Sequence, residues 1–208
     1  MTRLALIRHG PTDWNGEGRM QGHTNTSLST AGYAEVAARG ARGLNPHLAG
    51  YYWLASPLRR ARLTAALLCG FAPPQESRLI EMDWGDWEGR TLAEIRAEIG
   101  PALQQNEDRG LDFCPPGGES PRHIQDRVRP WLVEIAAQRP AVVAVTHKGV
   151  IRALMAGAYH WDMMGKPPVE LDWTRAHLFD VAPDGVLSPV EMNLPVNDPG
   201  LNTNGEGT

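Results

Sequence analysis

Apolar residues gather in three short runs along the chain, with no polar residues alternating between them. The runs are residues 4–7, 51–55 and 141–145. This pattern is typical of strands that are buried on both faces, as in a parallel sheet. Helical patterns lie between the runs, and this alternation predicts βαβ units around a mainly parallel sheet.

Helix start signals and helical spacing predict four helices between these runs. They begin or lie at residues 29–43, 56–68, 91–94 and 119–138. Ser29 is expected to cap the first helix. Ser56, with Pro57 at the first helical position behind it, is expected to cap the second. Thr91 and Glu94 have the spacing of a capping box at the start of the third.

Two later segments complete the predicted architecture. Residues 176–181 and 186–192 flank a Pro-Asp-Gly turn, and we predict a terminal hairpin that adds an antiparallel edge to the sheet. Residues 100–118 are polar and rich in proline and glycine, so a loop or lid is expected there. Together these elements predict an α/β protein.

The composition is ordinary for a soluble globular protein, because 42% of the 208 residues are apolar and 21% are charged. We predict one domain over residues 1–196. Residues 197–208 have almost nothing to bury, so a disordered tail is predicted there. The 20 basic residues against 24 acidic ones give a formal charge of −4, which argues against nucleic acid or a membrane surface as a partner.

The cysteine content and the hydropathy indicate the cellular compartment in which the protein is expected. Cys69 and Cys114 are too few for a scaffold built on disulfides, so a reducing environment is the simplest interpretation. The first residues contain no signal-peptide core, and no apolar stretch approaches the length of a membrane span. A cytoplasmic location is therefore expected.

Each of the three apolar runs ends in a polar cluster. The clusters begin at Arg8, Ser56 and Thr146. In open α/β sheets, ligands bind outside the carboxyl ends of the strands. We therefore expect the three clusters to converge on one pocket.

The expected pocket is rich in positive charge, because it contains Arg8, His9, His147 and either Arg59 or Arg60. These groups repel one another unless an anion balances them, and guanidinium groups bind the oxygens of a phosphoryl group bidentately. One histidine can attack phosphorus through a neutral ring nitrogen. The other, when protonated, can stabilise the charge on the phosphoryl oxygens.

Such a reaction also needs a proton donor for the leaving oxygen. Glu81 follows an apolar segment and enters a turn, so its carboxyl group can reach the site and act first as general acid and then as general base. The neighbouring carboxylates Asp83, Asp86 and Glu88 are the alternatives.

The stretch from Arg8 to Asn15, Arg-His-Gly-Pro-Thr-Asp-Trp-Asn, resembles a known signature. It is the Arg-His-Gly-x-Thr-x-x-Asn pattern of the histidine phosphatase superfamily, also called the phosphoglycerate mutase-like family. Three further segments are similar to the family's second motif, its acid-bearing motif and its second-histidine motif, in the family's order: residues 56–65, 81–89 and 146–152. In the second motif the arginine before alanine is the phosphate ligand, which selects Arg60 over Arg59.

This resemblance implies both a fold and a mechanism. The fold is a three-layer α/β/α arrangement, phosphoglycerate mutase-like, with a mainly parallel sheet and an antiparallel edge hairpin. The mechanism is a phosphohistidine intermediate at His9, with Arg8, Arg60 and His147 around the phosphoryl group and Glu81 as proton donor. The resemblance implies no metal and no cofactor.

Four further residues are assigned to substrate binding. Asn15 matches the family asparagine that contacts the phosphoryl group or the substrate. Gln21 and Gly22 lie in residues 19–29, which resemble the family's specificity loop but lack its usual Asp-x-Pro-Leu. Lys148 stands where the family usually has glycine. It is expected either to add positive charge at the pocket mouth, which favours a second anionic group on the substrate, or to be a solvated side chain.

These features predict a metal-independent phosphomonoester hydrolase that acts on a small phosphorylated metabolite. About thirty residues separate Gly89 from the Pro-Gly-Gly-Glu-Ser run at 116–120, whereas the cofactor-dependent phosphoglycerate mutases that the chain resembles carry a longer insert. That run is similar to the short-chain phosphatase branch, which favours a phosphatase over a mutase. A protein phosphohistidine phosphatase and a protein that only binds a phosphorylated ligand remain alternatives. The oligomeric state, a homodimer included, stays open.

Overall fold

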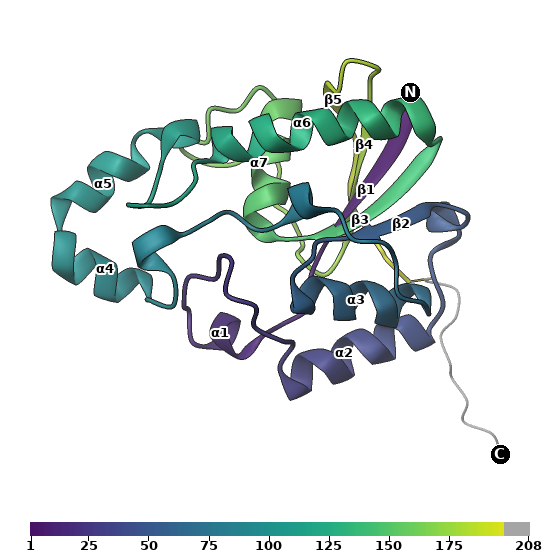
Figure 1. Ribbon diagram of the computed structural model, residues 1–208, viewed down its shortest axis with the longest axis horizontal. Helices are drawn as coiled ribbons and strands as arrows, with labels where there is room; N and C mark the ends of the chain where they lie inside the picture. The colour runs from purple at the N-terminus through teal and green to yellow at the C-terminus, as the bar shows by residue number, and fades with distance from the viewer. Residues whose placement is uncertain (198–208) are drawn as a thin grey trace.

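Five strands form one sheet at the centre of the computed structural model, which describes residues 1–197 (Figure 1). The strands are β1 (Thr2–Arg8), β2 (Tyr52–Ala55), β3 (Ala141–Thr146), β4 (Ala176–Val181) and β5 (Leu187–Leu194). Their order across the sheet is β2-β3-β1-β4-β5. The first three strands are parallel, whereas β4 and β5 run antiparallel and form the predicted edge hairpin.

Helices cover both faces of this sheet (Figure 1). One face carries α2 (Thr30–Ala41) and α3 (Arg59–Cys69), and the other carries α6 (Pro121–Gln138) and α7 (Lys148–Ala158). The side chains of β1 alternate between the two layers, since Leu4 and Leu6 pack on the α6 and α7 side while Ala5 and Ile7 pack on the α2 and α3 side. The predicted three-layer α/β/α arrangement is confirmed.

Two short helices, α4 (Leu92–Ile99) and α5 (Pro101–Glu107), extend away from the sheet and form a small lobe (Figure 1). The lobe has its own buried cluster, made of Trp87, Ile95 and Leu103. The prediction of a loop over residues 100–118 is therefore wrong in part, because α5 lies within it. In α5 only Leu103 is buried, so the segment is too polar for its helical period to show in the sequence.

Two of the predicted helix caps are confirmed. Ser29 accepts a hydrogen bond from the backbone N–H of Gly32 at the start of α2. Thr91 and Glu94 form a capping box at the start of α4. The remaining regular elements are short: α1 (Asp13–Gly16) and the 3-10 turns Pro46–Leu48, Ser77–Leu79, Gly85–Trp87 and Gly110–Asp112.

The predicted cap at Ser56 is wrong. α3 begins at Arg59, and its N-cap residue, Leu58, makes no side-chain hydrogen bond. The hydroxyl of Ser56 lies 2.7 Å from the Nε2 atom of His147, and it also accepts from the backbone N–H of Leu58 at 3.4 Å, one residue before α3 begins. Ser56 thus contacts both the helix start and the neighbouring strand end.

The described chain ends in contact with the folded domain. Asn197 forms an isolated β-bridge with Leu44, and its side-chain amide donates to the backbone carbonyls of Arg39, in the last turn of α2, and of Gly43, just after α2. The rest of the predicted disordered tail, residues 198–208, lies outside the described residues. Within residues 1–197, no helix combines the length and the apolar character that crossing a membrane requires.

Candidate active site

The pairing of two parallel strands places both motif histidines together. Arg8 is the last residue of β1 and lies opposite Thr146, the last residue of β3. The backbone N–H of His9 then donates to the carbonyl of Thr146 at 2.9 Å. His9 and His147 are therefore the first residues beyond two neighbouring strand ends, and their ring centroids lie 5.1 Å apart.

The hydrogen bonding of His9 suits a nucleophile. Its Nδ1 atom lies 2.7 Å from the carbonyl oxygen of Gly10, and only a protonated Nδ1 can donate to that acceptor. This contact assigns the hydrogen to Nδ1 and leaves a lone pair on Nε2. Burial first, and then the charges of Arg8 and Arg60, hold the pKa of His9 well below its ordinary value of 6.5. The ring is thus neutral at physiological pH.

His147 lies deeper than His9 and has no exposed surface. Its Nε2 atom contacts the Ser56 hydroxyl, whereas its Nδ1 atom has no hydrogen-bond partner. Burial lowers its pKa strongly, and the nearby His9 and Arg60 lower it further. A dianion bound beside His147 would oppose these effects and favour its charged form.

The two arginines are held differently. Arg60, near the start of α3, is completely buried, and its guanidinium group donates to the carbonyls of Gly22 and Thr24 at 2.8 and 2.9 Å. Burial lowers the pKa of Arg60 to about 10. Arg8 is partly exposed to the cavity and makes no side-chain hydrogen bond within residues 1–197.

Unpartnered nitrogens are concentrated at this site. Four buried side-chain atoms of the described residues lack a hydrogen-bond partner, and three of them belong to Arg8, Arg60 and His147. A buried donor without an acceptor costs roughly 1–3 kcal/mol. Arg8 lines the cavity, so an anion bound there, such as a phosphoryl group, can accept from its guanidinium group, while Arg60 and His147 lie behind the cavity surface. The arrangement is therefore suited to an anion rather than to a neutral ligand.

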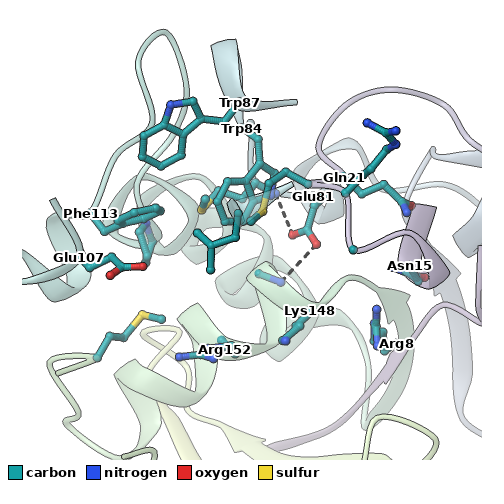
Figure 2. A pocket seen from close by; sticks show the side chains of 18 of the residues that line it. Arg8, Asn15, Gln21, Glu81, Trp84, Trp87, Glu107, Phe113, Lys148 and Arg152 are labelled. Atoms are coloured by element: carbon teal, nitrogen blue, oxygen red, sulfur yellow. Dashed lines mark hydrogen bonds between the residues drawn. The ribbon is translucent and has the colours of Figure 1, made fainter. Parts of the chain in front are cut away.

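Glu81 occupies the opposite side of the cavity floor from Arg8 (Figure 2). Its carboxyl group accepts hydrogen bonds from the backbone N–H groups of Met82 at 2.8 Å and Gly149 at 3.2 Å. Gly149 lies in the first turn of α7, so this helix start fixes the carboxyl group. Burial is the main reason that the pKa of Glu81 is raised above its ordinary 4.5. A raised pKa suits a general acid that must hold its proton.

A cavity of about 650 Å³ opens above these groups. Arg8, His9 and Glu81 line its inner end, while Arg60 and His147 do not reach its surface. The outer walls come from α7 and from the lobe, and they include Lys148, Arg152, Trp84, Trp87, Leu103, Glu107 and Phe113. The part of the protein around residues 100–118 therefore covers the cavity, as expected of a lid.

The four residues assigned to substrate binding do not all face the cavity. Asn15 lines it, and the Oδ1 atom of Asn15 accepts from the backbone of Thr12. Gln21 also lines it, but its amide is engaged with Thr12 and Thr26. Gly22 does not line it, and its carbonyl instead accepts from Arg60. Lys148, finally, lies in the wall beside the inner end.

Some residues at the cavity were not predicted from the sequence. Arg152 lines the cavity one helical turn after Lys148, and this spacing was visible in the sequence. Trp173 lies under Arg8 and Lys148, and no motif pointed to it. Arg59, the alternative to Arg60, is exposed and stays a surface residue. Within residues 1–197, no cluster of three or more His, Cys, Asp or Glu side chains is placed to hold a metal ion.

Comparison with known proteins supports the same class of site. A sequence profile of the Histidine phosphatase superfamily (branch 1) matches residues 4–191. A glucosyl-3-phosphoglycerate phosphatase of Mycobacterium tuberculosis is 38% identical over 169 residues, which cover 74% of each chain. A 2,3-bisphosphoglycerate-dependent phosphoglycerate mutase of Methylobacterium radiotolerans is 36% identical over 165 residues, which cover 73% of this chain and 76% of that protein.

Comparison with solved structures gives the same result as comparison of the sequences. A mycobacterial glucosyl-3-phosphoglycerate phosphatase in complex with VO3 matches with a TM-score of 0.78 and 29% identity, over 93% of this chain and 100% of that one. Bacillus stearothermophilus YhfR matches with a TM-score of 0.78 and 28% identity, over 93% and 98%. The chain belongs to the histidine phosphatase superfamily. The predictions of this family, of its fold and of a phosphatase are confirmed.

The contact between α7 and the acid can be tested at Gly149. A Cβ atom at this position would lie 2.4 Å from the Oε1 atom of Glu81, so the carboxyl group must move. We expect Gly149→Ala to lower kcat/KM for a phosphomonoester on the order of 10- to 100-fold, because small displacements of a reacting group are costly. Steady-state release of phosphate measures the change.

Gly157→Ala, in the same helix, is the matched control. Its Cβ atom would meet only Gln125, at 3.5 Å, so activity should stay at the wild-type level. Equal activity of Gly149→Ala and Gly157→Ala would contradict the role given to the helix start.

Buried histidines should make stability depend on pH. Burial lowers the pKa of His9, His147 and His177, to about 4 for His177. Below the ordinary value of 6.5 the folded protein then binds fewer protons than the unfolded chain, so stability present above that pH is lost as pH falls. We expect a loss of about 1.4 kcal/mol per pH unit for each histidine.

Urea unfolding at a series of pH values between about 7 and 5 measures this slope. Glu81, whose pKa is raised, gains a proton on folding, so it changes the free energy of unfolding with pH in the opposite direction. The informative quantity is therefore the difference between the slopes of the wild type and of a histidine variant. The change in free energy of unfolding per pH unit should be smaller for His9→Ala than for the wild type, by the contribution of one histidine. An unchanged slope would show that His9 is not held neutral by its surroundings.

Proposed function

We propose that this phosphatase hydrolyses the phosphomonoester of a small phosphorylated metabolite, without a metal ion, through a phosphohistidine intermediate on His9. The observation that carries the proposal is the contact between Nδ1 of His9 and the Gly10 carbonyl, which leaves a lone pair on Nε2 of a side chain that lines the cavity beside Arg8. Nitrogens of Arg8, Arg60 and His147 lack protein partners there, and phosphoryl oxygens would supply them.

In the first step the Nε2 lone pair of His9 attacks phosphorus, and the bond from phosphorus to the ester oxygen breaks. Glu81 gives its proton to the departing oxygen, which leaves as an alcohol. The attacking ring becomes positively charged, and the hydrogen bond from Nδ1 to the Gly10 carbonyl stabilises that charge. The positive charges of Arg8, Arg60 and a protonated His147 stabilise the negative charge on the phosphoryl oxygens.

In the second step a water molecule attacks the phosphohistidine. The Glu81 carboxylate accepts a proton from this water, the bond from phosphorus to Nε2 breaks, and inorganic phosphate is released. His9 regains its lone pair and Glu81 its proton, so the cycle closes without any other reactant.

The relatives narrow the choice of reaction and substrate. Several are named glucosyl-3-phosphoglycerate phosphatases, and one mycobacterial structure holds inorganic phosphate, which supports hydrolysis. We include glucosyl-3-phosphoglycerate among the first substrates to test. One relative is named a phosphoglycerate mutase, so phosphotransfer between oxygens of one substrate is the second candidate. The short insert between residues 89 and 116 favours hydrolysis.

The nucleophile can be tested directly with a panel of phosphomonoesters in EDTA. We expect the wild type to release phosphate from at least one of glucosyl-3-phosphoglycerate, 3-phosphoglycerate, fructose 2,6-bisphosphate, a nucleoside monophosphate and p-nitrophenyl phosphate. His9→Ala should abolish the release, because the variant lacks the ring nitrogen that attacks phosphorus. Radiolabelled phosphate should be trapped on the wild-type chain as an acid-labile, base-stable adduct.

His47→Ala is the control, because His47 is exposed and lies in a 3-10 turn outside the cavity. Loss of wild-type activity in EDTA would contradict metal independence. Faster interconversion of 2- and 3-phosphoglycerate than release of phosphate would identify a mutase instead.

The role of Glu81 predicts a dependence on the leaving group. A weakly basic leaving group such as p-nitrophenolate departs without a proton, whereas an alkoxide does not. In Glu81→Gln we expect a loss on the order of 10²- to 10⁴-fold for alkyl phosphates and a much smaller loss in the single-turnover release of p-nitrophenol. A series of substituted phenyl phosphates measures the trend. A loss that is independent of the leaving group would assign Glu81 a purely structural role.

A further inference from the structure

Two cationic side chains of α7 face the cavity next to the phosphoryl site. Lys148 is the first residue of α7, and Arg152 follows four residues later. Residues four apart lie on one face of a helix, with a rise of about 6 Å between them. Both line the cavity, and Figure 2 shows Arg8, Lys148 and Arg152 in a row along one side of it.

Neither charge is neutralised by the protein. Nine arginine–carboxylate ion pairs and one contact between His23 and Asp83 join other side chains of the described residues, and none of them includes Lys148 or Arg152. The two side chains also make no hydrogen bond within residues 1–197. Burial lowers the pKa of both groups, and the positive charges of Arg8 and Arg152 add to this effect at Lys148. A second anion at this wall would relieve the repulsion.

Aromatic rings hold these cations in place. The Trp173 ring centroid lies 5.4 Å from the Nζ atom of Lys148 and 5.7 Å from the Cζ atom of Arg8. The Trp161 ring centroid lies 5.4 Å from the Cζ atom of Arg152. A ring face orients a cation by its quadrupole without cancelling the charge. The two side chains are therefore positioned to bind a ligand while remaining charged.

The opposite wall has a different character. It carries the aromatic side chains Trp84 and Phe113 together with Glu107, which lies apart from Lys148 in Figure 2, while Glu81 lines the cavity on the side across from Arg8. Glu107 makes no ion pair with Arg152 within 4.0 Å. Glu107 would repel an anionic group, whereas the cations of α7 would attract it. The two walls of the cavity therefore differ in charge.

We propose that Lys148 and Arg152 form a second anion subsite beside the phosphoryl site, which binds a carboxylate or a second phosphate on the substrate. The proposal rests on the function proposed above, because it defines the substrate class of that same site.

Matched substrate pairs test the subsite. One pair is 3-phosphoglycerate and glycerol 3-phosphate, which differ in a carboxylate; the other is propane-1,3-diol bisphosphate and 3-hydroxypropyl phosphate, which differ in a phosphate. For each pair the readout is the ratio of kcat/KM for the member that carries the second anionic group to that for the member that lacks it. We expect a wild-type ratio on the order of ten or more for one pair, since a hydrogen bond to a charged group is worth about that much.

Lys148→Met and Arg152→Met should each lower that ratio several-fold, chiefly through a higher KM, and Lys148→Arg should retain it. Arg62→Met is the matched control, because Arg62 is exposed on α3 and lies outside the cavity. Its ratio should equal that of the wild type. The pair that responds more strongly identifies the second anion as carboxylate or phosphate.

Calorimetry measures the affinity of the same four compounds for His9→Ala and for the double variant His9→Ala with Lys148→Met. This comparison tests the subsite without turnover. A wild-type ratio near one for both pairs, or a ratio that Lys148→Met and Arg152→Met leave unchanged, overturns the subsite. A wild type that hydrolyses no compound, p-nitrophenyl phosphate included, overturns the proposed function. In that case the binding ratio still decides whether the subsite exists.

Discussion

The site depends on the parallel pairing of β1 with β3. This pairing sets Arg8 opposite Thr146, and the next backbone N–H, that of His9, donates to the Thr146 carbonyl. A strand register cannot shift by one residue without exchanging the two faces of the sheet, and both faces of β1 are buried. The hydrophobic packing of the two helical layers therefore fixes the relative position of His9 and His147.

The same arrangement has an electrostatic cost that is part of its function. Arg60 and two histidines are buried at the strand ends, and the pKa of each of these groups is lowered. In the proposed mechanism, the lowered pKa of His9 keeps its ring neutral and able to attack in the absence of a ligand. Unpartnered nitrogens of Arg8, Arg60 and His147 cost folding free energy, which a phosphoryl group bound as proposed would in part recover. The proposed binding and the proposed nucleophilicity then share one physical origin, the burial of these basic groups together.

The sequence predicted the strands and the core of the site because both follow local rules. Apolar runs mark the parallel strands, and the residue after each run falls at a sheet edge where ligands bind. Ser56 was misassigned because a serine before proline fits a helix cap, while its actual partner, His147, comes from a distant segment. Trp173 could not be predicted either, because its contact with Arg8 depends on how the chain after α7 returns to the sheet.

The helix α7 links the chemistry to the choice of substrate. Its first turn donates the Gly149 N–H to Glu81, and the side chains of Lys148 and Arg152 line the cavity from the same helix. A group bound by these two cations is therefore held by the element that also holds the acid. Because one rigid helix carries both contacts, binding energy gained at the second anion is available to align the ester oxygen with the Glu81 proton. If the proposed subsite and the proposed acid both hold, substrate recognition and proton transfer are joined by Lys148, Gly149 and Arg152 of a single helix.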